Sequence, residues 1–225
     1  MKYEAVIFDL YGTLIGNMPG YNSWLKEMAS IIGVPADSFI SEWHDAYDRR
    51  MTGKLKYFRD CLNYVCSRLN VVVDEDKMKQ ASDFRASKTN NEMGILQNNA
   101  IEVISRLKAK GLKLGLISNC STEATIRWKT TPFAPLFDAP VFSCSVGLMK
   151  PDPHIFQLAA QLLNVQPPSC IFVADGMDGE LRSAHNSGMH AVKIRFSESD
   201  QHDPHLEEWH GPTISSLSEV LNLVE

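Results

Sequence analysis

Five polar side chains of this sequence lie at the ends of short apolar runs or just beyond one: Asp9, Ser118, Asn119, Lys150 and Asp175. Two carboxylates, a hydroxyl and an ammonium group that meet in one place can bind an anion together with a hard cation. A carboxylate pair with few other ligands suits Mg²⁺, which keeps several waters and also binds substrate phosphates. An aspartate at such a place can attack a phosphoryl group, and Lys150 would offset the repulsion between that group and Asp9.

The apolar runs themselves predict the elements that bring these side chains together. Buried strands are expected over residues 5–8, 112–117, 140–143, 170–174 and 190–194. Helices are expected between and after them, over residues 100–110, 122–129, 153–163, 180–186 and 216–224. Strands that alternate with helices predict an α/β fold with a parallel sheet and helices on both faces. In such a sheet, ligands bind at the carboxyl ends of the strands, where these polar residues stand.

The stretch between the first and second strands has a different character. It shows helical periodicity, with helices expected over residues 21–32, 37–50, 57–69 and 74–88. The sequence therefore predicts a helical insertion after the first strand. The Asn-rich residues 88–99 are predicted to form the hinge that returns the chain to the sheet.

Composition restricts the classes of function. The 225 residues are 44% hydrophobic and carry a net charge of −5, which disfavours a nucleic-acid partner because such proteins show clustered basic charge. No apolar run has the length of a membrane span, and the first apolar run is too short for a signal peptide. The five cysteines lack the spacing of a metal site or a disulfide framework, which indicates reduced thiols and a cytoplasmic protein.

Four segments, in this order, resemble the motifs of the haloacid dehalogenase superfamily of hydrolases: residues 9–14, 117–119, 150–153 and 175–180. The resemblance implies a Rossmann-like catalytic core over residues 1–15 and 93–225, with a helical cap over residues 16–92. It also implies an aspartyl-enzyme intermediate and, for most members, Mg²⁺ as cofactor.

Carried onto this chain, the resemblance makes Asp9 the nucleophile and a metal ligand. The backbone carbonyl of Tyr11 and the side chains of Asp175 and Glu180 would be further metal ligands, with Asp178 as a rival to Glu180. Together with the residues that the strand ends indicate, the predicted site has three groups. Its members are catalytic Asp9, Ser118 and Lys150; substrate-binding Tyr11, Gly12, Thr13, Asn119 and Arg50; and metal-binding Asp9, Tyr11, Asp175 and Glu180.

Tyr11 departs from the phosphatase pattern, which has a second aspartate there as general acid and base. A tyrosine, with a reference pKa near 10, is a weak acid and no base at neutral pH. Tyrosine at this position is instead the pattern of 2-haloacid dehalogenases, whose halide leaves without a proton. Those enzymes lack an acid at the place of Asp175 and use an arginine that follows a tryptophan in the cap. Here His44 follows Trp43.

The leading prediction is a Mg²⁺-dependent phosphatase that acts on small, anionic phosphorylated metabolites. One alternative is a metal-free 2-haloacid dehalogenase, in which Asp9 attacks carbon. Another is a catalytically weak member of the superfamily that binds a ligand or a protein. The sequence leaves the substrate and the oligomeric state open.

Overall fold

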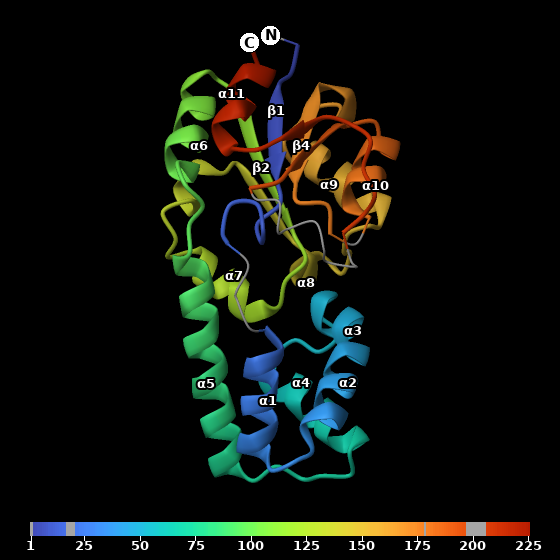
Figure 1. Cartoon of the computed structure of the whole chain (residues 1–225). Coiled ribbons are helices and arrows are strands. Elements are labelled where there is room, and N and C mark those ends of the chain that lie inside the picture. The colour runs from blue at the N-terminus through green and yellow to red at the C-terminus, as the bar shows by residue number, and fades with distance from the viewer. Residues whose placement is uncertain (1, 17–20, 178, 197–205) are drawn as a thin grey trace.

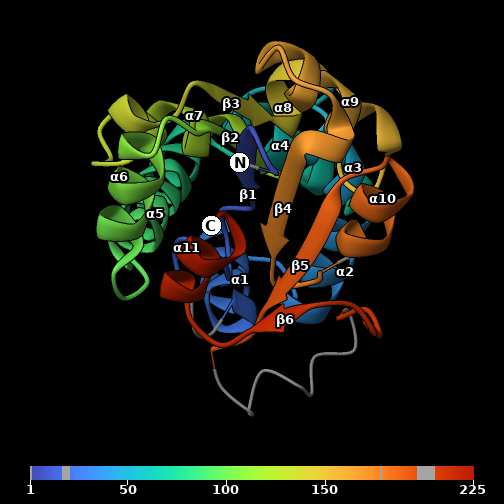
Figure 2. The same ribbon diagram turned by 90° about the horizontal axis from the view of Figure 1, so that it is seen from above.

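A six-stranded parallel sheet organises the core of the fold. The computed structural model describes residues 2–16, 21–177, 179–196 and 206–225. Within them the strands are β1 (Ala5–Phe8), β2 (Lys113–Ser118), β3 (Ala139–Phe142), β4 (Cys170–Ala174), β5 (His190–Ile194) and β6 (Thr213–Ile214). Their order is β3-β2-β1-β4-β5-β6, with every neighbouring pair parallel. The first strand of the chain therefore lies in the interior of the sheet, between β2 and β4 (Figure 2).

Helices cover both faces of this sheet, which confirms the predicted α/β class. They are α6 (Ala100–Ala109), α7 (Thr122–Trp128), α8 (Ser143–Val146), α9 (Pro153–Leu162), α10 (Glu180–Asn186) and α11 (Val220–Leu223). Short 3₁₀ helices η1 (Ala134–Leu136), η2 (Pro167–Ser169) and η4 (Leu217–Glu219) complete the core. Helices α6 and α11 share one apolar cluster with the sheet, and α9 and α10 share another (Figure 2).

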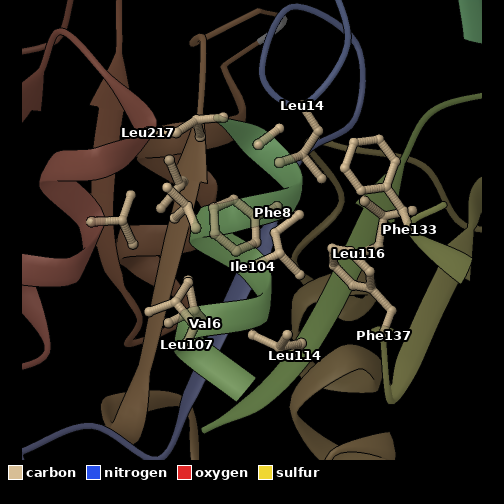
Figure 3. Packing of buried hydrophobic residues seen from close by; sticks show 14 of the residues in the cluster. Val6, Phe8, Leu14, Ile104, Leu107, Leu114, Leu116, Phe133, Phe137 and Leu217 are labelled. Carbon is tan, nitrogen blue, oxygen red and sulfur yellow. The ribbon is translucent and has the colours of Figure 1, made fainter. Parts of the chain in front are cut away.

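Strand β1 shows how the apolar runs build these two clusters. Val6 and Phe8 point to one face, where Phe8 packs near Ile104 of α6 (Figure 3). Ile7 points to the other face and joins the cluster of Phe156 from α9. Side chains alternate along a strand, and a parallel sheet covered on both faces therefore needs continuous apolar strands. The fully buried run that results ends at Asp9.

The insertion forms a helical layer at one end of the core (Figure 1). Its helices are α1 (Tyr21–Ile32), α2 (Ala36–Asp45), α3 (Tyr47–Met51), α4 (Phe58–Arg68) and α5 (Glu75–Gly94). They enclose an apolar cluster of their own, which includes Trp24, Trp43 and Leu62. Among the described residues, no helix combines the length and the apolar character that a membrane span requires.

Several predicted element boundaries are wrong. The helix expected over residues 37–50 is divided at Ala46 into α2 and α3. Helix α5 continues to Gly94, through much of the predicted hinge, because buried Thr89 and Met93 anchor its last turns and packing outweighs the weak helix propensity of asparagine. The closing helix expected over residues 216–224 is a 3₁₀ turn followed by α11. Strand β6 and the short helix α8 were not predicted.

The two connections between core and insertion run side by side. Ile15 and Leu96 form an antiparallel bridge. The Gly16 N–H donates to the carbonyl of Ile95 at 2.7 Å, and the Gln97 N–H donates to the carbonyl of Leu14 at 3.0 Å. The chain therefore leaves and re-enters the core at one place.

A second contact joins the insertion to the core at Gly53, just after α3. Its φ of +71° is in the left-handed region, and a Cβ there would collide with the carbonyl oxygen of Cys144 in α8. The left-handed conformation alone costs about 1–2 kcal/mol for a residue with a side chain. We expect Gly53→Ala to lower the thermal unfolding midpoint by roughly 2–8 °C, because each kcal/mol is worth about 2–4 °C in a chain of this size.

The matched control is Gly94→Ala, at the end of α5. A Cβ on Gly94 meets no atom within 4 Å, and its φ is not in the left-handed region. This variant should unfold at the wild-type temperature or slightly above it, since alanine favours helix. Circular dichroism melts of the three proteins make the comparison. Equal midpoints for the two variants would show that Gly53 and Cys144 are not in close contact.

Candidate active site

The carboxyl ends of three adjacent strands carry the polar side chains that the sequence singled out. Asp9 follows β1 directly, Ser118 is the last residue of β2, and Asp175 follows β4. Because β2, β1 and β4 are neighbours in the sheet, these side chains emerge at one edge. Asp9 is 5% exposed and Ser118 is fully buried. The predicted location of the site at this edge agrees with the general rule for open α/β sheets.

A buried ammonium group lies at the centre of this edge. Lys150 Nζ donates to Asp9 Oδ1 and, at 2.5 Å, to Glu180 Oε2. All three side chains are at most 6% exposed. Burial by itself lowers the pKa of Lys150, but the negative charges of Asp9 and Glu180 outweigh it and raise that pKa above its ordinary value. Lys150 therefore stays protonated over the whole physiological pH range.

Three carboxyl groups converge around this ammonium. Asp9, Asp175 and Glu180 each contribute one carboxylate oxygen, and these three oxygens lie within 4.8 Å of one another. Burial, reinforced by the charge of Asp9, raises the pKa of Asp175 to about 6. Burial likewise raises the pKa of Glu180 well above its usual range, and Lys150 only partly opposes this. Three carboxyl groups therefore share a single ammonium group as their described cation.

The donor set of the cluster fits Mg²⁺. Hard oxygen ligands from one or two carboxylates, with room for water and phosphate, are what this ion takes in proteins. Burial, with the neighbouring carboxylates, raises the pKa values of Asp175 and Glu180, and a bound divalent cation would favour their charged forms. Asp9 and Asp175 would hold the ion, with Glu180 beside them.

Local hydrogen bonds fix the two acids that follow β4. The Met177 N–H donates to Asp175 Oδ1 at 3.2 Å, and the Gly176 N–H donates to Glu180 Oε1 at 3.2 Å. Glu180 is the first residue of α10, so the helix itself sets its position. Asp178, the predicted rival of Glu180 as metal ligand, lies outside the described residues.

The side chain of Asn119 positions Lys150 by binding the backbone of Lys150. The Asn119 Nδ2 donates to the carbonyl of Lys150 at 2.8 Å, while the Lys150 N–H donates to Asn119 Oδ1 at 2.8 Å. This pair of bonds joins the end of β2 to the loop that carries the ammonium group. Asn119 was predicted as a substrate-binding residue, and that role stays a prediction. In the structure its oxygen and one of its N–H groups bind the backbone of Lys150, which gives the side chain a positioning task.

Two hydroxyl groups at the site have no partner among the described groups. Thr13 Oγ1 and Ser118 Oγ are both buried, and neither makes a hydrogen bond. A buried hydroxyl without a partner is costly, and such groups are often found where a ligand binds. These two predicted site residues, Ser118 at the end of β2 and Thr13 in the turn after Asp9, therefore have hydrogen-bonding capacity in reserve.

The loop that follows Asp9 closes on itself. Gly12 has a φ of +75°, as a tight turn requires. Its N–H donates to the carbonyl of Ile15 at 2.9 Å, and its predicted role in substrate binding stays a prediction. Tyr11 is partly buried against the main apolar cluster of the core. Its predicted role as a metal ligand through the backbone carbonyl stays a prediction.

Arg50 is not brought into contact with the carboxylate cluster. It lies in α3, 4% exposed, and its Nη2 donates to the carbonyl of Trp43 at 3.1 Å. The guanidinium also lies 4.2 Å from the centre of the Trp43 ring. Its described contacts are therefore with other residues of the insertion.

Sequence reasoning missed Ser143. This fully buried residue follows β3, and its hydroxyl accepts a hydrogen bond from the Cys120 N–H at 3.0 Å. It thereby holds the segment after β2 against the segment after β3. The signal was present, because Ser143 is a polar residue at the end of an apolar run, as Ser118 is.

Known proteins resemble this chain over most of its length. The sequence profile of a family described as haloacid dehalogenase-like hydrolase matches residues 3–188. Acyl-CoA dehydrogenase family member 10 of Mus musculus is 28% identical over 208 residues, which are 86% of this chain but 18% of the mouse protein. The chain thus spans less than a fifth of that relative.

Two bacterial relatives are matched over nearly their whole length. A phosphorylated carbohydrates phosphatase of Thermotoga maritima is 27% identical, over 84% of this chain and 83% of its own. An (S)-2-haloacid dehalogenase of Pseudomonas putida is 24% identical, over 97% of this chain and 95% of its own.

A solved structure shows the same fold. The haloacid dehalogenase-superfamily phosphatase of Thermococcus onnurineus superposes with a TM-score of 0.70 at 20% identity, over 98% of this chain and 97% of its own. The family match covers all four motifs and the strands that carry them. This chain therefore belongs to the haloacid dehalogenase-like hydrolase family.

Proposed function

We propose that the chain is a Mg²⁺-dependent hydrolase of small phosphorylated metabolites that uses Asp9 as its nucleophile. The observation that carries this proposal is the convergence of Asp9, Asp175 and Glu180 within 4.8 Å. A dehalogenase needs one carboxylate as nucleophile and no cation. A phosphatase needs further carboxylates to hold the cation that neutralises its doubly charged substrate.

The first step forms a bond between an Asp9 carboxylate oxygen and the phosphorus atom, and breaks the bond from phosphorus to the ester oxygen. The leaving oxygen departs with the bonding electron pair. The Lys150 ammonium, already against Asp9, offsets the charge repulsion between nucleophile and phosphoryl group. The unpartnered hydroxyls of Ser118 and Thr13 are available to donate to phosphoryl oxygens. Bound Mg²⁺ would supply further charge neutralisation.

The second step is hydrolysis of the acyl phosphate on Asp9. A water molecule attacks phosphorus, the bond to the Asp9 oxygen breaks, and inorganic phosphate leaves with the carboxylate regenerated. Neither step changes an oxidation state. Lys150 holds Asp9 in place through both steps, and Asn119 holds the loop of Lys150.

We further propose that residues 16–92 act as a cap domain over this site. The helices α1–α5 form an apolar cluster separate from those of the sheet. They follow the loop that carries Asp9, and they meet the core again at Gly53. Substrate selection would then depend on this domain, and chemistry on the core.

A second candidate function is that of a metal-free 2-haloacid dehalogenase. Tyr11 favours it, together with the relative of Pseudomonas putida that carries this activity in its name. In that reaction Asp9 would attack the carbon that bears the halogen and displace halide, and water would then hydrolyse the ester. Asp175 would have no task in this chemistry.

The metal assignment is tested by replacing Asp175 with alanine. We expect Asp175→Ala to weaken Mg²⁺ binding at least about tenfold and to lower hydrolysis of an aryl phosphate in proportion, because the ion loses one of its charged oxygen ligands. Isothermal titration calorimetry with MgCl₂ measures the first effect, and phenolate release measures the second.

Asp83→Ala serves as the matched control, since Asp83 is an exposed acid of α5 that pairs with Lys79. It should bind Mg²⁺ as the wild type does. Unchanged Mg²⁺ affinity in Asp175→Ala would refute the metal site. Turnover of 2-chloropropionate that is equal with and without a chelator would favour the dehalogenase.

A further inference from the structure

Two cysteines follow neighbouring strands of the sheet at matching positions. Strands β2 and β3 pair in parallel, with Ser118 opposite Phe142. The same register, continued for two residues beyond each strand, places Cys120 opposite Cys144. Neighbouring strands lie about 4.7–4.9 Å apart, and the Cα atoms of a disulfide are usually about 4.4–6.8 Å apart. The topology therefore brings these two thiols within reach of one covalent bond.

A buried hydroxyl group holds the two segments in this alignment. Ser143 Oγ accepts a hydrogen bond from the Cys120 N–H at 3.0 Å and donates to the carbonyl of Cys120 at 3.4 Å. The side chains are also in contact, because the Cys120 S–H donates a hydrogen bond to the Cys144 sulfur. Both residues are free cysteines. The structure therefore holds a reduced pair of thiols that face each other.

The two thiols differ in access and in acidity. Cys120 is 3% exposed, and its hydrogen bond to Cys144, together with burial, raises its pKa. Cys144 is partly exposed. Its pKa falls to about 7, chiefly because the Cys120 S–H donates to it, with help from the hydroxyls of Ser145 and Thr122 and against the effect of burial. An accessible thiolate beside a second thiol is the arrangement of a redox-reactive cysteine and its resolving partner.

The three other cysteines lack this arrangement. Cys61 and Cys66 lie in α4, Cys170 is the first residue of β4, and all three are buried. Burial raises the pKa of Cys66, that of Cys61 to about 12 and that of Cys170 to about 11. They therefore stay protonated at physiological pH and provide an internal comparison for the reactive pair.

The cysteine pair lies between the candidate active site and the insertion. Cys120 follows Asn119, whose side chain binds the backbone of Lys150, and the positive charge of Lys150 acts on the Cys120 thiol. Cys144 is in α8, and its carbonyl oxygen is the atom that a Cβ on Gly53 would meet. Figure 1 shows α8 at the end of the sheet that faces α3. A change at the two sulfur atoms would therefore act on the segment that holds Lys150.

We propose that Cys144 and Cys120 are an oxidation site, which hydrogen peroxide converts to a disulfide, and that this bond slows the enzyme. The Cys144 thiolate attacks one peroxide oxygen, the O–O bond breaks, and the departing hydroxide takes up a proton to become water. Cys144 is then a sulfenic acid. The Cys120 sulfur attacks the Cys144 sulfur, the S–O bond breaks, and the hydroxide leaves as water with the Cys120 proton. Two thiols are oxidised and one peroxide is reduced to two waters.

The effect on turnover rests on the proposed function, whereas the disulfide does not. A covalent bond is much shorter than a hydrogen-bonded contact between two sulfur atoms, so its formation must draw Cys120 toward Cys144 and shift the adjacent Asn119. Because a misplacement of about 1 Å near a catalytic group can cost on the order of 10²-fold, we expect kcat for an aryl phosphate to fall at least roughly tenfold on oxidation. Dithiothreitol should restore it.

Peptide mass mapping tests for the bond itself. The reduced protein is treated with a small excess of hydrogen peroxide, the remaining thiols are blocked with N-ethylmaleimide, and the chain is cut with trypsin. Arg127 and Lys129 lie between the two cysteines, so Cys120 and Cys144 fall on different peptides. We expect these peptides to be joined and lighter by two hydrogens than their sum, and to separate again after treatment with dithiothreitol.

Three variants identify the thiols that react. Cys144→Ser should form no joined peptide and should keep its rate after treatment with peroxide. Cys120→Ala should stop at the sulfenic acid of Cys144, which dimedone traps. The matched control is Cys66→Ala, because Cys66 is a buried cysteine of the insertion, and it should be oxidised as the wild type is. Thermal melts establish that each variant is folded.

The mass measurement needs no substrate, which separates this inference from the proposed function. Absence of the joined peptide from the oxidised wild type, or an equal loss of rate in Cys144→Ser, would overturn the inference. A joined peptide with an unchanged rate of hydrolysis would refute the effect on the active site and retain the phosphatase. A joined peptide in a protein that hydrolyses no phosphate ester would support the oxidation site and refute the proposed function.

Discussion

Asp9→Asn is expected to abolish hydrolysis, with a loss in kcat on the order of 10⁴-fold or more, as is usual when a nucleophile is removed. An amide is a poor nucleophile for phosphorus and a poor ligand for Mg²⁺. Asparagine has nearly the same shape as aspartate, so the buried position at the end of β1 is filled. What the variant loses is charge, because Lys150 then has Glu180 as its remaining described ionic partner.

Steady-state assays with an aryl phosphate and with 2-chloropropionate measure this effect, because both candidate reactions use Asp9. Asp76→Asn is the control, since Asp76 is an exposed acid of α5 and should have wild-type rates. Circular dichroism shows whether the variant is folded. Turnover by Asp9→Asn close to the wild-type rate would exclude an aspartyl-enzyme mechanism for either reaction.

Tyr11→Asp is expected to raise the rate of alkyl phosphate hydrolysis, whereas Asp9→Asn abolishes hydrolysis. In the wild type no carboxyl group stands two residues after the nucleophile, so an alkoxide leaving group has no acid at this place to protonate it. Aryl phosphates, whose phenolate leaves readily, should therefore be hydrolysed much faster than alkyl phosphates. An aspartate at position 11 would supply the proton and help to activate the attacking water. We expect the hydrolysis of alkyl phosphates to become at least tenfold faster. General acid–base catalysis as a whole contributes about 10²–10⁴-fold.

The assay pairs one aryl and one alkyl phosphate on both proteins in the presence of Mg²⁺. The gain should be smaller for the aryl substrate, because its leaving group needs no proton. Tyr11 packs partly against the core, so a thermal melt must accompany the rates. An unchanged ratio of aryl to alkyl hydrolysis in a folded variant would contradict the missing-acid argument. A dehalogenase would lose halide release and gain nothing on phosphates.

The sequence predicted the parts of the fold that depend on local pattern. Strands β1, β4 and β5 and helices α1 and α10 have the predicted bounds, because a largely apolar run or a periodic apolar face specifies each of them. The errors occur where tertiary contacts decide. Helix α5 extends to Gly94 since Met93 is buried against the core, and no local signal distinguishes that methionine from one at a helix end.

In the candidate site, too, local sequence pattern predicted some residues and tertiary contacts decided the others. Polar residues at strand ends located Asp9, Ser118 and Asp175, since parallel strands must end at one edge. The task of Asn119 was not predictable, because it depends on the path of the loop that carries Lys150. The motif pattern alone indicated Glu180, and its contact with Lys150 required α10 to begin at that residue.

The paired connections at Ile15 and Leu96 have an evolutionary consequence. Because the chain leaves and re-enters the core at one bridge, the ends of the helical segment are adjacent whatever lies between them. The entropy of closing such a loop grows only slowly with its length, and insertions are tolerated where chain ends lie close together. Selection can therefore lengthen, shorten or replace the segment while the sheet and its buried charges stay intact. A graft of another helical segment between Gly16 and Ile95 would be the laboratory equivalent of that exchange.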